Sequence, residues 1–181
     1  MVEVIHLDSS LLRGMMDPED ENGKRNEARH LFNSSPGVRF RISILAIGEV
    51  MGKMAETRSA SACAEAAAHL SRLFRGNRLD LFGIGKDGEA MLLANELMEL
   101  DHMLTPADAL LAACAMIDED CSTFATTDRR LAESVSLLSE AERRGLRILD
   151  ARTHRSGRNT SQLGRTAHLC LRRATQPLSE T

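Results

Sequence analysis

Short apolar runs alternate along the chain with longer stretches in which apolar residues recur at helical spacing. The runs lie at residues 2–7, 38–42, 79–84, 122–125 and 146–149, and the first is β-branched and mostly apolar, as a buried parallel strand is. The helical stretches begin near residue 9, at 25–34, after Ser43, and at 59–75, 89–103, 105–117 and 129–144. Strands alternating with helices predict an α/β protein with a mostly parallel sheet covered on both faces.

Local signals set several of the expected helix ends. Ser43 is a good N-cap for a helix that carries Ile44, Ile47, Met51 and Met54 on one stripe. The segment Thr105-Pro106-Ala107-Asp108 has a capping threonine, a proline in the first turn and an acid three residues after the threonine. The helix that follows, through residue 117, is apolar on almost every side and is expected to be buried, and Gly145 is expected to end the helix at 129–144.

Length and charge predict one domain with an appendage. The chain has 181 residues and a net charge of -3, but residues 151–181 hold six arginines against one glutamate, a net charge of +5, so the body carries about -8. We therefore expect a domain over residues 1–150 and a basic, flexible tail over residues 151–181. An acidic body excludes a broadly basic nucleic-acid surface and leaves room for a local one.

Redox state and location follow from what the sequence lacks. No apolar run approaches the roughly 20 residues that a membrane helix requires, and no basic leader followed by an apolar core opens the sequence. The four cysteines form no CxxC pair, and two of them fall among alanines. We expect a cytoplasmic protein, with no membrane partner and with reduced, buried thiols.

Four acidic residues stand out because of where the predicted elements place them. Asp8 and Asp128 follow predicted strands, Asp108 opens the apolar helix, and Glu49 lies at the edge of a helical stripe. Each has a simple alternative role, since the aspartates could be helix caps and the glutamate could be solvated. If they converge, each pair at ~4 Å repels by roughly 4 kcal/mol at an effective dielectric near 20, and a hard divalent cation would relieve the repulsion.

The segments that carry these acids resemble the PIN-domain nucleases. They are HLDSSLL, ISILAIGEVMGKM, LTPADALLAACAM and STFATTDRRL, in that order, and the resemblance covers about residues 2–150. It implies a three-layer α/β/α fold with a central, mostly parallel sheet. It also implies that Asp8, Glu49, Asp108 and Asp128 are catalytic and hold one or two Mg²⁺ or Mn²⁺ ions, and that Ser9 and Thr126 lie near the metal and contact the substrate.

The same resemblance implies a metal-dependent endoribonuclease that leaves a 5′-phosphate and a 3′-hydroxyl. Many short members of this family are toxins of toxin–antitoxin pairs, so a cognate antitoxin is an expected partner beside RNA, although the arginine-rich tail departs from their pattern. With five phenylalanines and no tyrosine or tryptophan, RNA contact is expected mainly through the phosphate backbone. An apolar surface on the helix at 59–75 would suit a homodimer. The alternative is a non-cleaving scaffold of the same fold that binds RNA or protein.

Overall fold

The computed structural model describes residues 3–17, 24–82 and 87–153. In chain order the elements are β1 (Val4–Leu7), α1 (Ser9–Met16), α2 (Lys24–Ser34), β2 (Arg39–Ser43), α3 (Ile44–Thr57), α4 (Ala60–Arg75), β3 (Leu79–Phe82), α5 (Asp87–Leu100), α6 (Pro106–Ile117), β4 (Cys121–Thr126), α7 (Arg129–Glu133), α8 (Val135–Arg143) and β5 (Arg147–Asp150).

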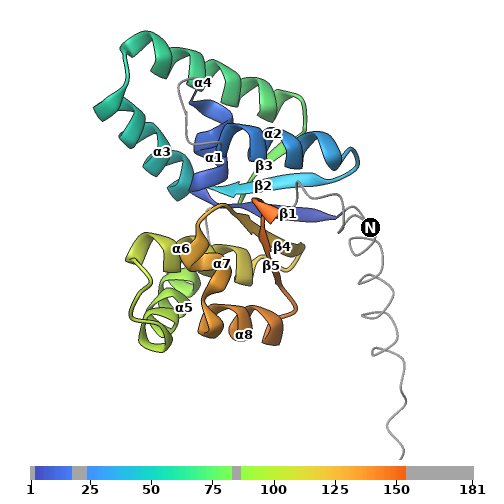
Figure 1. Ribbon diagram of the computed structural model, residues 1–181, viewed down its shortest axis with the longest axis vertical. Helices are drawn as coiled ribbons and strands as arrows, with labels where there is room; N and C mark the ends of the chain where they lie inside the picture. The colour runs from blue at the N-terminus through green and yellow to red at the C-terminus, as the bar shows by residue number, and fades with distance from the viewer. Residues whose placement is uncertain (1–2, 18–23, 83–86, 154–181) are drawn as a thin grey trace, which may run out of the picture.

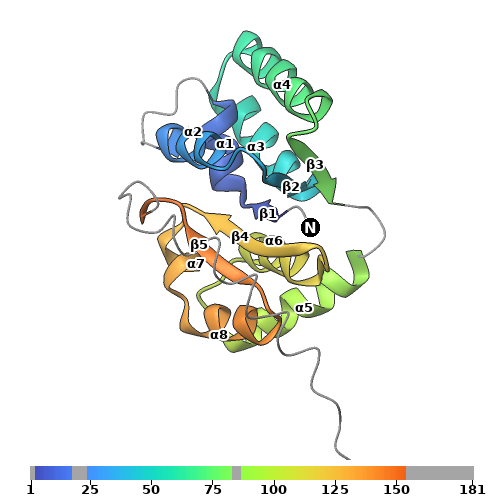
Figure 2. The same cartoon turned by 90° about the vertical axis from the view of Figure 1, so that its right-hand side faces the viewer.

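The five described strands form one parallel sheet in the order β3-β2-β1-β4-β5. Helices α1–α4 cover one face and helices α5–α8 the other (Figure 1), and the view turned by 90° shows the same three layers (Figure 2). The expected α/β/α architecture with a parallel sheet is confirmed. Because β1 lies between β2 and β4, the chain leaves the sheet in opposite directions at the carboxyl ends of β1 and β4, where ligands bind in folds of this kind.

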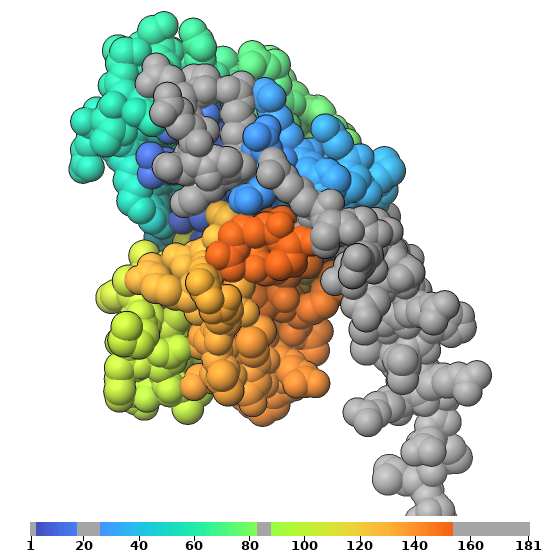
Figure 3. Space-filling model, in the orientation of Figure 1, coloured from blue at the N-terminus to red at the C-terminus, as the bar shows by residue number. Residues whose placement is uncertain are grey.

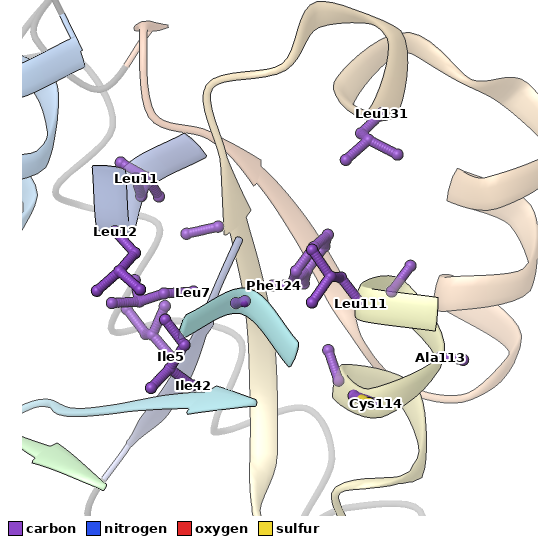
Figure 4. Packing of buried hydrophobic residues seen from close by; sticks show 14 of the residues in the cluster. Ile5, Leu7, Leu11, Leu12, Ile42, Leu111, Ala113, Cys114, Phe124 and Leu131 are labelled. Carbon is purple, nitrogen blue, oxygen red and sulfur yellow. The ribbon is translucent and has the colours of Figure 1, made fainter. Parts of the chain in front are cut away.

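The sheet is held by apolar packing on both faces. All four residues of β1 are buried, and Leu11 and Leu12 of α1 lie on one side of the sheet while Leu111 of α6 lies on the other (Figure 4). Helix α6 is buried from Leu111 to Ile117, as its all-round apolar sequence predicts. Among the described helices, none combines the length and the apolar character needed to cross a bilayer.

The predicted helix at 129–144 is wrong as a single element, because two helices, α7 and α8, meet at Ser134. The Ser134 backbone is extended, and its hydroxyl accepts a 3.2 Å hydrogen bond from the amide of Leu137 and donates a 2.5 Å bond to Asp101. Serine competes with helical hydrogen bonding through such local contacts. In the sequence Leu131, Val135 and Leu138 keep helical spacing across the break, so periodicity does not reveal it.

Two other expectations need correction in detail. Helix α5 ends at Leu100 instead of residue 103, because the carboxylate of Asp101 accepts a 3.0 Å bond from the amide of Met103 and forms a turn. The buried stripe of α3 consists of Ala46, Val50 and Met54. Ile44, which was expected on that stripe, is 47% exposed.

The chain remains packed just beyond β5. Ala151 is buried, and its amide donates a 2.9 Å hydrogen bond to the carbonyl oxygen of Thr126. The predicted basic tail falls, from residue 154 on, outside the described residues, as do the loop at 18–23 and the last two residues of the strand predicted at 79–84.

Helix α4 has the predicted bounds but does not present a large apolar surface. Its buried residues are Ala62, Ala66 and Leu70. The large apolar side chains that are exposed in the described part of the chain lie on α3, β3, α5, the turn after α5, and α8. In the space-filling view of Figure 3, the layer of α1–α4 (blue to green) lies above the layer of α5–α8 (yellow-green to orange). A homodimer through α4 stays a prediction.

Candidate active site

Asp8 is a buried carboxylate at the carboxyl end of the central strand. It directly follows β1 and is 2% exposed, and its amide donates a 3.0 Å bond to the carbonyl oxygen of Ala125 in β4. Its Oδ1 atom accepts a 2.7 Å bond from the amide of Ser9, so Asp8 is also the N-cap of α1. Oδ2 accepts bonds from the hydroxyls of Ser10 (2.6 Å) and Thr126 (2.8 Å). The alternative prediction that Asp8 caps a helix is therefore confirmed, and its Oδ2 atom has further partners.

Two hydroxyls join the ends of β1 and β4 into one network. The Thr126 hydroxyl donates to Asp8 and accepts a 2.9 Å bond from the amide of Asp128. The Ser10 hydroxyl donates to Asp8 and accepts a 3.1 Å bond from the amide of Thr127. Each hydroxyl is used as donor and acceptor at once, which fixes the position of the Asp8 carboxylate without neutralising its charge.

Burial is the main influence on the pKa of Asp8. Burial raises the pKa of Asp8 above its ordinary value, the three hydrogen bonds counteract that rise, and the negative charge of Asp108 adds to it. Asp8 and Asp108 come from different layers, since one precedes α1 and the other lies in the first turn of α6. The charge of Asp108 thus reaches Asp8 from the other side of the sheet, with a smaller effect than burial or the hydrogen bonds.

Asp108 and Asp128 share one cation, the guanidinium of Arg130. The Nη2 atom of Arg130 lies 3.5 Å from Oδ2 of Asp108 and 3.1 Å from Oδ2 of Asp128. Asp128 also caps α7, since its Oδ1 atom accepts a 2.8 Å bond from the Arg130 amide. Thr105 caps α6 as predicted, since its hydroxyl accepts a hydrogen bond from the amide of Asp108. The same hydroxyl donates a 2.7 Å bond to the Asp108 carboxylate.

Glu49 is positioned differently from the three aspartates. It lies in the second turn of α3, and its carboxylate forms a 2.5 Å ion pair with Lys53, one turn further along. Its side chain is about one quarter exposed. Since β1, β2 and β4 are parallel, α3 begins at the same edge of the sheet as α1 and α7. The structure thus links Asp8, Asp108 and Asp128 through Thr126 and Arg130 and leaves Glu49 paired within its own helix.

Two side chains show what sequence reasoning missed. Ser10, not Ser9, supplies the hydroxyl that contacts Asp8, while Ser9 contributes its amide. Arg130 contacts both Asp108 and Asp128 and so joins two of the acids. The available signal for Ser10 was its place in the first turn of α1, two residues after a strand-end acid. No local signal points from Arg130 to a residue 22 positions earlier.

The acidic side chains are of a type that binds divalent metal ions, but they are not arranged around a common point where a metal could bind. Within residues 3–17, 24–82 and 87–153, no group of three or more acidic, histidine or cysteine side chains is arranged to hold a metal. The carboxylate oxygens of Asp8, Asp108 and Asp128 are hard donors of the kind that Mg²⁺ and Mn²⁺ prefer. Arg130 stands between two of the three, so a metal ion bound by both Asp108 and Asp128 would have to displace its guanidinium.

Solved structures with the same fold are found despite low sequence identity. No protein-family model matches the sequence, and no curated protein is similar to it in sequence. The structure of VapBC2 from Rickettsia felis, bound to a DNA fragment from their promoter, aligns at 13% identity over 81% of this chain and 97% of that chain, with a TM-score of 0.51. FitAcB from Neisseria gonorrhoeae aligns at 14% identity over 82% and 98%, with a TM-score of 0.52. The chain therefore has a PIN-like fold of the VapC type.

Proposed function

We propose that the chain is a metal-dependent endoribonuclease whose site is formed by Asp8, Asp108 and Asp128, with Glu49 as the fourth acid. The observation that carries this proposal is the network at the carboxyl ends of β1 and β4, in which Thr126 joins Asp8 to Asp128 and Arg130 joins Asp128 to Asp108. Burial raises the pKa of Asp8 and the charge of Asp108 adds to that rise, so a cation beside Asp8 would stabilise its ionised form. The PIN-like fold supports the same assignment, because the resemblance to PIN-domain nucleases implies a catalytic role for these four acids.

The chain's own groups divide the work between holding charge and fixing geometry. Asp8, Asp108 and Asp128 would hold one or two Mg²⁺ or Mn²⁺ ions, and Ser10 and Thr126 would orient Asp8 through its Oδ2 atom. A bound divalent cation supplies a Lewis acid for the phosphoryl oxygens and lowers the pKa of water toward neutrality. Glu49 would join them if its side chain turned from Lys53, which an exposed pair within one helix permits at a cost of about 0.5 kcal/mol.

A toxin role with a cognate antitoxin is the biological setting that the comparisons favour. The two solved structures reported above, VapBC2 and FitAcB, share the fold over nearly their whole length. Their likeness supports an antitoxin partner for this chain. RNA as the substrate is proposed from the resemblance of the acidic segments to PIN-domain nucleases.

A non-cleaving scaffold is the second candidate, and Arg130 is the observation that favours it. The guanidinium neutralises part of the charge of Asp108 and Asp128 without any metal. In a scaffold this arrangement would be permanent. In a nuclease it must be exchanged for a metal ion.

An RNA-cleavage assay with metal titration separates the two. We expect the purified protein to cleave single-stranded RNA with Mg²⁺ or Mn²⁺ and to stop when the metal is chelated. Asp8→Asn and Asp108→Asn should each lower the rate by about 100-fold or more, as loss of a metal's charge stabilisation does. Asp120→Asn is the matched control, because its exposed carboxylate pairs with Arg41 at the opposite end of β4.

Folding of each variant is checked by circular dichroism and thermal unfolding. A parent protein that is inactive on diverse RNAs with either metal would support the scaffold. Cleavage at the parental rate by Asp8→Asn and Asp108→Asn would show that the site lies elsewhere.

A further inference from the structure

The acidic site already contains a cation of its own, the guanidinium of Arg130. One nitrogen atom, Nη2, contacts a carboxylate oxygen of Asp108 on α6 and a carboxylate oxygen of Asp128 before α7. The Arg130 side chain is 57% exposed, against 18% for Asp108 and 27% for Asp128. A solvent-exposed group therefore covers two more buried acids at the point where α6 and α7 approach each other.

Several contacts hold Arg130 in this place. Its amide and its Nε atom face Oδ1 of Asp128, at 2.8 and 3.5 Å, while Nη2 faces Oδ2 of the same carboxylate. Asp128 thus holds both the backbone and the side chain of Arg130, and the fork of the guanidinium extends from it to Asp108. An arginine is suited to such a bridge because its planar group offers several donors in fixed directions.

The neighbouring arginine shows that the bridge is specific to position 130. Arg129 has the same chemistry, but its Nε atom contacts both carboxylate oxygens of Glu133, at 2.8 and 2.9 Å, on the outer side of α7. The two residues are adjacent in sequence and lie on different faces of the helix, so only one of this pair faces the candidate site.

We propose that Arg130 is a positioning residue that occupies the place of the divalent cation in the metal-free protein and sets how tightly that cation binds. This inference rests on the proposed metal-dependent function. A metal ion and a guanidinium cannot both bind the same oxygens of Asp108 and Asp128 at close range, and their like charges repel. Because exposed ion pairs are weak, the exchange of one cation for the other costs little, and Arg130 acts as a competitor that holds the carboxylates in place until metal arrives.

The test measures metal binding without RNA, so it does not depend on activity. Mn²⁺ is titrated into the full chain by isothermal calorimetry, and free Mn²⁺ is followed by electron paramagnetic resonance. Arg130→Gln should bind Mn²⁺ about fivefold more tightly than the parent, the equivalent of about 1 kcal/mol for a lost exposed pair. Arg130→Lys should fall between the two, since lysine keeps the charge without the fork.

Arg129→Gln is the matched control, because it removes the same charge one residue away and leaves the bridge intact. Its Mn²⁺ affinity should stay within about twofold of the parent, a long-range charge effect alone. Equal affinities for Arg130→Gln and Arg129→Gln, whether raised or unchanged, would overturn the proposal and leave the metal site standing, provided that Asp108→Asn abolishes binding. Absence of Mn²⁺ binding in the parent and in every variant would overturn both this inference and the proposed function.

Discussion

The hydroxyl of Thr126 donates a 2.8 Å hydrogen bond to Oδ2 of Asp8, a residue 118 positions earlier in the chain. The same hydroxyl accepts a 2.9 Å bond from the amide of Asp128. One side chain at the end of β4 therefore sets the position of two acids of the candidate site. Thr126 was expected to contact substrate, and that role stays a prediction, whereas its contacts with the acids are present in the structure.

Thr126→Val should destabilise the protein and disturb the site. Valine has the same shape but leaves the buried Asp8 carboxylate and the Asp128 amide without this partner, which costs about 1–3 kcal/mol in the free energy of unfolding. Thr127→Val is the control, because the buried Thr127 hydroxyl has no hydrogen-bond partner among the described residues, and the change should be neutral or slightly stabilising. Urea unfolding measures both, and equal losses would contradict the importance of the bridge.

His6 should make the protein less stable in mild acid. The ring is fully buried between Phe82 and Phe124, and neither nitrogen has a hydrogen-bond partner in the part of the chain that is described. Burial, with a further contribution from Arg41, lowers the pKa of His6 from 6.5 to about 3. Between these values the unfolded chain binds a proton that the folded protein does not, so the free energy of unfolding falls as the pH falls, by about 2 kcal/mol from pH 6.5 to pH 5.

Urea unfolding at pH 7 and pH 5 tests this dependence on His6. The difference between the two pH values should shrink by about 2 kcal/mol in His6→Phe, which cannot titrate. His102→Asn removes an exposed histidine and should keep the parental difference. If the free energy of unfolding of His6→Phe changed between pH 7 and pH 5 as much as that of the parent, the loss of stability in acid would have another source.

Ser134→Ala should weaken the junction between α7 and α8. Alanine removes the cap of α8 and the hydroxyl that donates to Asp101, so the free energy of unfolding should fall by about 1–2 kcal/mol. Ser139→Ala, in the exposed part of α8, should change it by less than about 0.5 kcal/mol. Thermal unfolding compares the two, and a parental melting temperature for Ser134→Ala would show that the break does not depend on the serine.

Arg58→Met should destabilise the protein strongly, and more than the loss of an exposed arginine such as Arg129. Arg58 contacts both carboxylate oxygens of Asp17, whose side chain is 0% exposed, and Arg13 lies 3.7 Å away as a weaker partner. Removing one member of a buried pair costs about 3 kcal/mol because a charge is left in a poorly solvated place. Arg129→Met, which breaks an exposed pair with Glu133, should cost less than about 1 kcal/mol, and similar losses in both variants would contradict the role of burial.

The elements that sequence predicts well are those whose signals are local. The apolar run of β1, the cap at Thr105 and the positive φ at Gly145 each act within a few residues. Local features of this kind can be predicted from sequence, because buried strands, helix caps and turns each favour characteristic residue types. Asp8 and Asp128 could also be placed at strand ends on this basis, since parallel strands end at one edge of a sheet.

The sequence by itself determined the order and type of most elements and the three-layer fold that follows from their alternation. Only the tertiary structure decided which partners the polar groups found. Ser134 breaks a helical pattern because Asp101, 33 residues earlier, lies within reach of its hydroxyl. Arg130 joins Asp108 to Asp128 because α6 and α7 meet at the sheet edge, and Glu49 stays with Lys53 on its own helix. Polar contacts depend on distances of a few ångströms between segments far apart in the chain, and residue spacing does not encode those distances.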